Sequence, residues 1–558
     1  FNMHENKWLT RQRRKRQKHL VTELLFDYAK NSTLHGLRYI ADRQLTSFEK
    51  IFWFATFVAS LSICSYHISN VYVKWRTSPV IVSVSEKQVS VGMVPFPSVT
   101  ICPQIKSKAS VYNFTEQTAR LSASSTDFSE YNYTEQTDSL SDFSDDEIQK
   151  YNDIAMLCNY DYETNYEVIL RALNLSSDLK ILQTIYEVSP TNLEMFFDCR
   201  IHGEPRDCRK LLKRVLTAEG LCYNFNGIAA EELFRNYSSF VSNITENDTP
   251  SKGWTLDTGY NDSVNDFYPF RGKENGAKPD LEIVMYANIS ESDGLCNGKN
   301  SGYKIYLHNP VDIPESSLYY YAALYNQVSS LAVNLNILTT SETLQSYKPE
   351  IRQCYFAKEK YLRFFKIYTA KNCRFECLTN NTFKKCDCVL YYMPHETSTN
   401  ICRRKDKECV EQAHAEMLKR ELQMDTENEN DGYCRCLPAC DSIEYDAEIL
   451  KTEYNLAGFY GKLFKSAFNE SLEDVFDPKE IKFSKIDMYF KKPYYVSMRR
   501  SELFGWTDFV ANIGGLLGVF LGFSFLSLVE IIYFLTIRLG FTLKRDMDEE
   551  KNTRNTTE

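Results

Sequence analysis

The feature that most constrains this chain is a long apolar run near its C-terminus, from Phe509 to Ile537, in which Glu530 is the only charged residue. At about 1.5 Å per residue, a helix of this length crosses a hydrocarbon core of about 30 Å. Gly514, Gly518 and Gly522 recur at every fourth position, on one helical face where backbones can approach closely. A carboxylate at membrane depth is costly unless it faces a bundle interior or a water-filled path. The run therefore predicts either a glycine-rich packing face or part of a pore.

A first apolar run, Ile51–Val73, is also long enough to span and has no charge inside it. A basic cluster, Arg11–Lys18, precedes it. Beside a spanning helix, such a cluster indicates a topogenic or lipid-facing role rather than a nucleic-acid patch, and the positive-inside rule places both termini in the cytoplasm. The expected organisation is a cytoplasmic segment over 1–47, membrane helices over 48–73 and 507–537, an extracellular domain over 74–506 and a cytoplasmic segment over 538–558.

The cysteines fit this topology. The chain has 17 cysteines, and only Cys64 falls in a predicted span. The other 16 lie in the predicted outer segment, where oxidising conditions favour pairing. That segment also holds ten candidate N-glycosylation sites, at Asn113, Asn132, Asn174, Asn236, Asn243, Asn247, Asn261, Asn288, Asn380 and Asn469. The net charge of −9 suits a cation-attracting surface but also an ordinary acidic glycoprotein.

Local patterns predict a mixed outer domain of helices and strands. Crowded cysteines from Cys373 to Cys440 favour disulfides over zinc, because histidine is scarce there. Alanine and leucine at helical spacing predict a helix over Glu408–Asn428. Alternating runs predict strands over Val80–Val91 and Tyr303–His308, and a Ser-, Thr- and acid-rich stretch predicts a flexible insertion over Thr115–Asp146.

Five motifs follow one another along the chain. They are STLHGLRYI, with His35 and Gly36; FPSVTICP, from Phe96; GLCYNFN, from Gly220; CRCLPACDSIEY, from Cys434; and, in the second run, Ile-Gly-Gly from Ile513 followed by Gly-Phe-Ser from Gly522. In these motifs and their order the chain resembles the degenerin/epithelial sodium channel family, from about Ser32 to Glu530. The branch that it resembles most in general character is the invertebrate FMRFamide-gated sodium channels.

The resemblance implies a disulfide plan that spacing alone does not choose. It pairs Cys102 with Cys222, Cys199 with Cys208, Cys354 with Cys440, Cys373 with Cys436, Cys377 with Cys434, Cys386 with Cys409, and Cys388 with Cys402. Cys158 and Cys296 remain, and we predict that they form an eighth bond outside the family's common pattern.

The resemblance also implies a plasma-membrane homotrimer with an α+β ectodomain of palm, finger, thumb, knuckle and β-ball parts. Gly522, Phe523 and Ser524 match the family's selectivity tripeptide, where a glycine permits the helix to break and expose carbonyls. His35 and Gly36 would re-enter the membrane near Gly522. The remaining implied pore and gate residues are Ala511, Asn512, Gly515 and Glu530. The permeant ion would be sodium, an amiloride-type compound would block the pore, and no cofactor or metal is expected.

The stimulus is open at this point. The acid-sensing branch of the family carries a Trp-bearing loop, but this chain has no Trp between Trp254 and Trp506, and Pro103 stands where most relatives have Asn. An acidic outer domain rich in Tyr and Phe suits a short amidated peptide that carries Arg, a free amine and Phe rings. An FMRFamide-like peptide is the favoured ligand, with acid-sensing or constitutive opening as alternatives. A non-conducting peptide receptor is an alternative of another class, and an enzyme is least expected because no nucleophile-and-base set emerges. The peptide-binding residues are not predicted, beyond a location near Cys158 and Cys296.

Overall fold

The computed structural model describes residues 19–77, 80–123, 144–158, 180–235, 249–261, 267–273, 276, 278–296, 301–314, 319–423, 434–456 and 479–555. The chain forms two compact units, and each is described by itself. Unit 1 comprises Phe1–Ile81, Thr343–Arg352 and Ser501–Glu558, and unit 2 comprises Val82–Glu342 and Gln353–Arg500.

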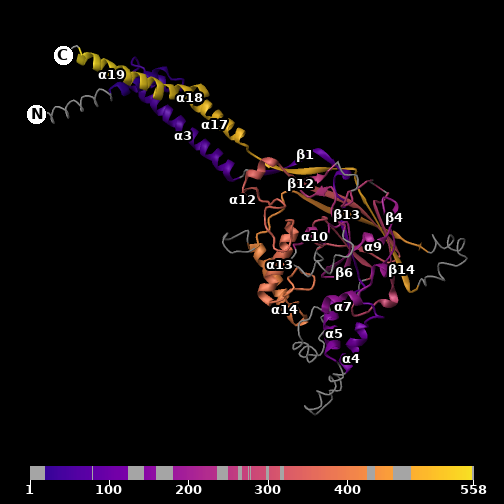
Figure 1. Ribbon diagram of the computed structural model, residues 1–558. Helices are drawn as coiled ribbons and strands as arrows, with labels where there is room; N and C mark the ends of the chain where they lie inside the picture. Colours follow the sequence, from indigo (N-terminus) through magenta and orange to yellow (C-terminus); the bar gives the residue numbers. More distant parts are fainter. Residues whose placement is uncertain are drawn as a thin grey trace, which may run out of the picture. The chain divides into compact units, whose positions relative to one another are not determined.

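Unit 1 contains the helices of membrane length. Two helices are long and apolar enough to cross a membrane, over Ser47–Arg76 and Phe525–Asp548, and a shorter apolar helix covers Trp506–Leu521. Helix α3 lies beside α17 (Figure 1). The ring of Trp75 in α3 stacks on that of Phe509 in α17, with 4.7 Å between the ring centroids. The elements are α2 (Leu37–Ala41), α3 (Ser47–Thr77), η3 (Glu342–Ser346), α12 (Pro349–Arg352), α17 (Trp506–Leu521), α18 (Phe525–Ile532), the π-helical η5 (Tyr533–Arg538) and α19 (Leu539–Asn555).

Unit 2 is built on two β-sheets whose inner faces share one apolar core. The larger sheet has the order β1-β15-β12-β14-β9-β3-β4, with β13 also paired to β12, and the smaller has the order β11-β10-β2-β6-β5. Strand β12 runs parallel to β14 and antiparallel to β13. The strands are β1 (Val80–Ser90), β2 (Ser98–Pro103), β3 (Phe196–Ile201), β4 (Glu204–Arg206), β5 (Lys213–Thr217), β6 (Gly220–Phe225), β7 (Trp254–Thr255), β8 (Gly259–Tyr260), β9 (Leu281–Asn288), β10 (Tyr303–His308), β11 (Tyr321–Ala323), β12 (Gln327–Thr340), β13 (Ser442–Glu453), β14 (Ile481–Phe490) and β15 (Tyr494–Glu502).

The core between the sheets arises from alternation along the strands. Residues Ile283 of β9 and Leu331 of β12 are fully buried, and so is Ile101 of β2 in the smaller sheet. Each strand turns successive side chains to opposite faces, so the apolar set of one face collects in one layer. The two sheets together therefore enclose one apolar core of unit 2.

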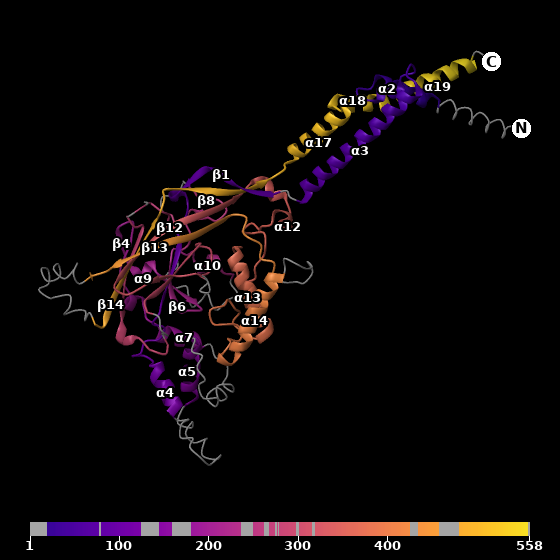
Figure 2. The same ribbon diagram turned by 180° about the vertical axis from the view of Figure 1, so that it is seen from behind.

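Helices of unit 2 enclose a second apolar core. Helices α13 and α14 lie side by side, and α5 packs against α7 (Figure 2). The helices are α4 (Phe114–Ala123), α5 (Asp145–Leu157), α7 (Lys180–Val188), α8 (Asn192–Met195), α9 (Cys208–Leu211), α10 (Ala230–Leu233), α13 (Ala370–Cys386) and α14 (Lys407–Gln423), with the short turns η1 (Val91–Met93), η2 (Ile289–Glu291) and η4 (Arg404–Asp406). The architecture is the predicted one: two apolar helices near the chain ends and a β-rich, disulfide-rich domain between them.

Eight disulfides cross-link unit 2. They are Cys102–Cys222, Cys158–Cys296, Cys199–Cys208, Cys354–Cys440, Cys373–Cys436, Cys377–Cys434, Cys386–Cys409 and Cys388–Cys402, and the free thiol is that of Cys64 in α3. These pairs are the ones that the resemblance implied, together with the eighth pair. Cys386–Cys409 and Cys388–Cys402 lie within the α13–α14 hairpin, and Cys373–Cys436 and Cys377–Cys434 tie α13 to the segment that precedes β13. Cys354–Cys440 joins the segments that flank the hairpin.

Several predicted boundaries differ from the structure. Helix α3 continues to Thr77, and the segment beyond the second span is helical as α19. The prediction of a flexible insertion over Thr115–Asp146 is wrong at both ends, because α4 covers Phe114–Ala123 and α5 begins at Asp145. Phe114 and Leu121 are buried on one face of α4, so its polar composition conceals a packed helix. Residues 124–143 lie outside the described part of the chain.

Candidate functional site

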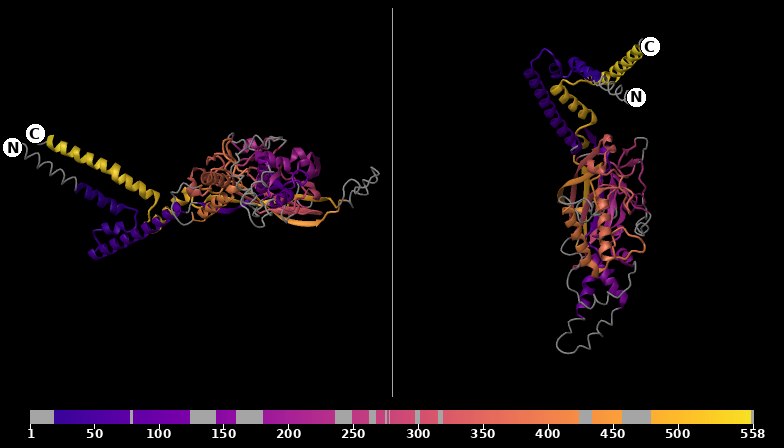
Figure 3. Two further views of the ribbon diagram at one scale, coloured as in Figure 1. Left: turned by 90° about the horizontal axis from the view of Figure 1, so that it is seen from below. Right: turned by 90° about the vertical axis from the view of Figure 1, so that its left-hand side faces the viewer.

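The second membrane helix is interrupted at Gly522–Ser524, between α17 and α18 (Figure 3). Gly522 has a left-handed backbone with φ of 65°, a conformation that a glycine adopts without steric cost. The Phe523 amide donates to the carbonyl of Leu517, and the Ser524 amide donates to the hydroxyl of Ser527. In a continuous helix, these two amides would donate to the carbonyls four residues before them, at positions 519 and 520. Here they donate elsewhere, so these two carbonyls lose their helical hydrogen bonds.

The N-terminal segment meets this interruption. The His35 amide donates to the Leu521 carbonyl at 3.0 Å, across nearly the whole chain length. A methyl group built on Gly522 would lie 2.7 Å from Nδ1 of the His35 ring, so only a glycine fits under the imidazole. His35 thus lies against Gly522, as the resemblance implied. Gly36, with φ of 92°, precedes α2, and a methyl group on it would face the Phe57 ring at 3.5 Å.

A small polar cluster follows one turn further along α18. Glu530 accepts hydrogen bonds from the amide and the hydroxyl of Thr33, at 3.3 and 3.0 Å. The Thr33 hydroxyl also lies 2.7 Å from that of Ser527, which is buried. Ser524, Ser527 and Glu530 recur every third residue, so they share one helical face. The carboxylate therefore has partners in the same chain.

Two of these residues escaped the sequence reasoning. Thr33 precedes the His-Gly pair by two positions, and its role depends on a contact between segments almost 500 residues apart. No local pattern signals such a contact. Ser527 did carry a signal, because it lies three residues from both Ser524 and Glu530 on the helix face that had already been singled out.

The remaining predicted pore residues lie on α17 and make few contacts within the chain. The Asn512 side chain donates to the Asp508 carbonyl in its own helix. Ala511 is exposed, and a methyl group on Gly515 would meet nothing within 4 Å. At the other end of the site, Arg538 donates to Asp27 at 2.5 Å. The single chain thus leaves this face of α17 open.

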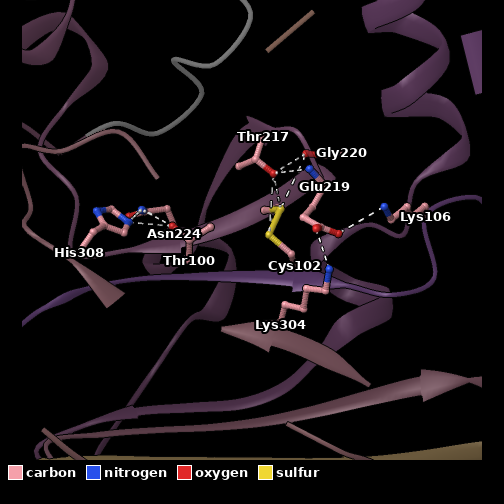
Figure 4. The surroundings of a disulfide bond; sticks show 10 residues. Thr100, Cys102, Lys106, Thr217, Glu219, Gly220, Asn224, Lys304 and His308 are labelled. Carbon is pink, nitrogen blue, oxygen red and sulfur yellow. Dashed lines mark hydrogen bonds and ion pairs between the residues drawn. A yellow bond between two sulfur atoms is a disulfide. The ribbon is translucent and has the colours of Figure 1, made fainter. Parts of the chain in front are cut away.

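Unit 2 contains a buried polar cluster around the Cys102–Cys222 bond (Figure 4). Glu219 lies between the ammonium groups of Lys304, at 2.7 Å, and Lys106, at 3.3 Å. His308 contacts the Thr100 hydroxyl and the Asn224 amide, and burial lowers the pKa of His308 to about 4. The imidazole is therefore neutral throughout the mildly acidic range, and the cluster is structural at these pH values.

A cavity of about 180 Å³ lies where α5 faces the loop over 397–403. Asp153 of α5 lines it and is 4% exposed. Its Oδ1 accepts from the Gln149 amide at 2.9 Å, whereas its Oδ2 has no hydrogen-bond partner among the described residues. Burial raises the pKa of Asp153 to about 7, against the smaller opposing effects of Gln149 and Arg403. Asp153 precedes Cys158, one half of the Cys158–Cys296 bond, by five residues.

Four of the ten candidate glycosylation sites fall in the described part of the chain. The asparagines are exposed or half-buried, as a glycan requires. They are Asn113, Asn261, Asn288 and Asn380. The other six, Asn132, Asn174, Asn236, Asn243, Asn247 and Asn469, lie outside the described residues.

Two membrane-length helices, an interrupted second span and a disulfide-rich domain between them define a membrane channel subunit. The family described as "Amiloride-sensitive sodium channel" matches residues 28–534. The chain belongs to this family, the degenerin/epithelial sodium channels, whose members are plasma-membrane ion channels and not enzymes.

Three relatives illustrate the match. Pickpocket protein 28 of Drosophila melanogaster is 30% identical over 521 residues, which cover 92% of this chain and 78% of that protein. Sodium channel protein Nach of Drosophila melanogaster is 24% identical, over 94% of this chain and 88% of that protein. Acid-sensing ion channel 2 of Danio rerio is 22% identical, over 94% and 87% respectively. The names of these three relatives mention no peptide.

Proposed function

We propose that the chain forms a homotrimeric, sodium-selective channel whose filter is Gly522, Phe523 and Ser524. The observation that carries this proposal is the interruption of the second span, where the carbonyls at positions 519 and 520 lose their helical amides. Three-fold symmetry turns each carbonyl into a ring, and such a ring replaces part of a cation's hydration shell. Ser524 caps α18 with its hydroxyl and so fixes where the helix resumes.

The proposed inner pore continues along α18. Glu530 adds a carboxylate ring that raises the local cation concentration, and Thr33 holds this carboxylate in place. His35 and Gly36 form the re-entrant segment beside the filter, and both chain termini lie in the cytoplasm. On α17, the exposed face with Ala511, Asn512 and Gly515 forms the gate and the binding region for an amiloride-type blocker, in keeping with the family's description.

The proposed stimulus is an extracellular FMRFamide-like peptide. The supporting observation is the cavity lined by Asp153, because a carboxylate suits the guanidinium or amine of such a peptide. Binding opens the pore only to the extent that the open state binds the peptide more tightly than the closed state. Proton gating is the second candidate, because the pKa of Asp153, raised by burial to about 7, falls in the range that acidification crosses.

The test of the pore is expression of the full chain in oocytes under voltage clamp. We expect inward sodium current that amiloride blocks. Ser524→Leu should reduce the preference for sodium over potassium, because its bulkier side chain distorts the filter ring. The matched control is Ser62→Leu in α3, where the serine hydroxyl donates to the Val58 carbonyl of its own helix. Equal sodium preference in Ser524→Leu and wild type would contradict the assignment of the filter.

The test of the stimulus applies FMRFamide, other amidated peptides and acid in turn. We expect current with peptide, and Asp153→Asn should raise the half-activating peptide concentration about tenfold or more, since a charge-assisted hydrogen bond contributes roughly 1.5–3 kcal/mol. Asp207→Asn, at an exposed helix cap, is the control and should leave this concentration unchanged. Current with acid but not with peptide would contradict peptide gating and support proton gating. No current with any stimulus would favour a non-conducting receptor.

A further inference from the structure

A second cavity of unit 2, of about 100 Å³, lies where the α13–α14 hairpin meets the end of β5. Leu216 lines it from β5, Phe375 and Leu378 line it from α13, and Val410 and His414 line it from α14. This cavity shares no lining residue with the one that Asp153 lines, and it has no part in the function proposed above.

The two helices turn one face each toward the cavity. Phe375 and Leu378 are three residues apart in α13, and Val410 and His414 are four residues apart in α14. Side chains at these spacings lie together on one face of a helix. Apart from His414, these residues present hydrocarbon and an aromatic ring, so the surface that they give the cavity is apolar.

Hydrogen bonds and a disulfide hold the walls in place. The Asn381 side chain donates to the Ala413 carbonyl at 2.7 Å and so ties α13 to α14. Leu390 and Met393 line the cavity from a segment that the Cys388–Cys402 bond closes, and the Met393 amide donates to the Leu390 carbonyl at 2.9 Å. A preformed cavity avoids the entropy of ordering its own walls on binding.

The polar group that this cavity offers a ligand is the imidazole of His414. The side chain is half-buried, and it makes no hydrogen bond or ion pair to the described residues. The Thr217 hydroxyl also lines the cavity but accepts from the Glu219 amide at 3.1 Å. Among the described residues that line the cavity, none is acidic and none carries a permanent positive charge. A charged ligand would therefore lose hydration there without gaining a counter-ion.

A phenol fits this combination of an apolar space and one imidazole. An apolar cavity of about 150 Å³ stays dry and binds benzene, so a cavity of about 100 Å³ holds a single ring at most. A phenolic hydroxyl both donates and accepts, so it pairs with either nitrogen of a neutral imidazole and also with an imidazolium.

We infer that this cavity binds a small neutral phenol, with its ring against Leu216, Phe375 and Val410 and its hydroxyl on His414. A ring held there contacts α13, α14 and β5 together, so it stabilises the position of the hairpin on β5. Binding at this site depends neither on peptide gating nor on the assignment of the filter.

The test follows the fluorine-19 resonances of three probes as the purified full-length channel is added. The probes are 4-fluorophenol, fluorobenzene, which lacks the hydroxyl, and the charged 4-fluorobenzoate. The dependence of line broadening on protein concentration gives an apparent dissociation constant for each probe. We expect 4-fluorophenol to bind roughly threefold to tenfold more tightly than fluorobenzene, the effect of one neutral hydrogen bond, and 4-fluorobenzoate to bind most weakly.

Two variants locate the binding. His414→Leu should abolish the preference for 4-fluorophenol over fluorobenzene, because it removes the imidazole. Val410→Phe places a ring of the protein in the cavity and should abolish the binding of both neutral probes. If Val410→Phe does not fold, His414→Leu still tests the contact with the hydroxyl.

Gln412→Leu, at an exposed position of α14, is the control and should behave as wild type. Uptake of the probes by detergent is the same for all of these proteins, so it cancels in the comparison. Equal binding of 4-fluorophenol and fluorobenzene to the wild type would overturn the inference. Tightest binding of 4-fluorobenzoate, or a preference for 4-fluorophenol that His414→Leu leaves unchanged, would also overturn it.

Discussion

Replacement of Gly522 by alanine tests the geometry of the filter directly. The backbone at Gly522 is left-handed, which costs an alanine about 1–2 kcal/mol. The new methyl group would also lie 2.7–2.8 Å from three ring atoms of His35. Forcing a methyl group into a packed site costs a further 1–3 kcal/mol or so. The two effects together total about 2–5 kcal/mol, which is enough to shift the local equilibrium at the filter by more than tenfold.

The assay is voltage clamp combined with surface labelling of the expressed protein. We expect Gly522→Ala to reach the surface with a reduced sodium preference or little current. Gly540→Ala is the matched control, because a methyl group there meets nothing within 4 Å. Adding His35→Ala to Gly522→Ala removes the ring but not the backbone strain, so selectivity should recover in part. The reasoning would be refuted if Gly522→Ala and Gly540→Ala gave the same sodium preference and current.

Three further predictions concern other parts of the chain. Burial raises the pKa of Asp153 from 3.8 to about 7, so ionisation of this carboxyl destabilises the folded state increasingly from about pH 4 to pH 7, by up to about 4 kcal/mol. Asp153→Asn should therefore raise the unfolding temperature relative to wild type at pH 8 but not at pH 4. An equal difference in unfolding temperature at both pH values would contradict this prediction. Replacing both Cys158 and Cys296 by serine removes a cross-link between residues 138 positions apart and should lower the free energy of unfolding by about 2–4 kcal/mol. The measurement is a lower unfolding temperature under non-reducing conditions. An unchanged unfolding temperature would contradict a stabilising role of this bond. Thr33→Val removes the hydroxyl that donates to Glu530 and should alter single-channel sodium conductance at unchanged surface expression. Thr33→Ser, which keeps the hydroxyl, should behave as wild type. Unaltered conductance in Thr33→Val would count against a role of this contact in the pore.

Sequence patterns were sufficient wherever one residue type repeats with the period of an element. The strand at Tyr303–His308 was predicted at its observed bounds, and the strand from Val80 ends one residue earlier than expected. The predicted helix over Glu408–Asn428 begins one residue earlier, as α14. Composition was misleading at α4, because averaging over the polar stretch hid the buried positions of Phe114 and Leu121, which lie seven residues apart.

The pairing of cysteines needed more than the sequence pattern. Sixteen cysteines permit a very large number of pairings, and only the resemblance chose among them. The pair Cys158 and Cys296 followed by elimination once the other seven were assigned. The cavity beside Asp153 had no local pattern in the sequence, since it is lined by segments that are distant in sequence and adjacent only in the fold.

The contacts of the N-terminal segment with the second span follow a single antiparallel order. His35 bonds to Leu521, Thr33 bonds to Glu530 and Asp27 bonds to Arg538, so each step backward from His35 meets a later position in the C-terminal helices.

Because the three contacts lie along one short N-terminal segment, a displacement of the whole segment would disturb all three of them. The carbonyl of Leu521, released by the helix interruption, has its donor in His35 and not in its own helix. The shape of the filter region is therefore a property of two segments from opposite ends of the chain, and an apolar run read by itself could not reveal it.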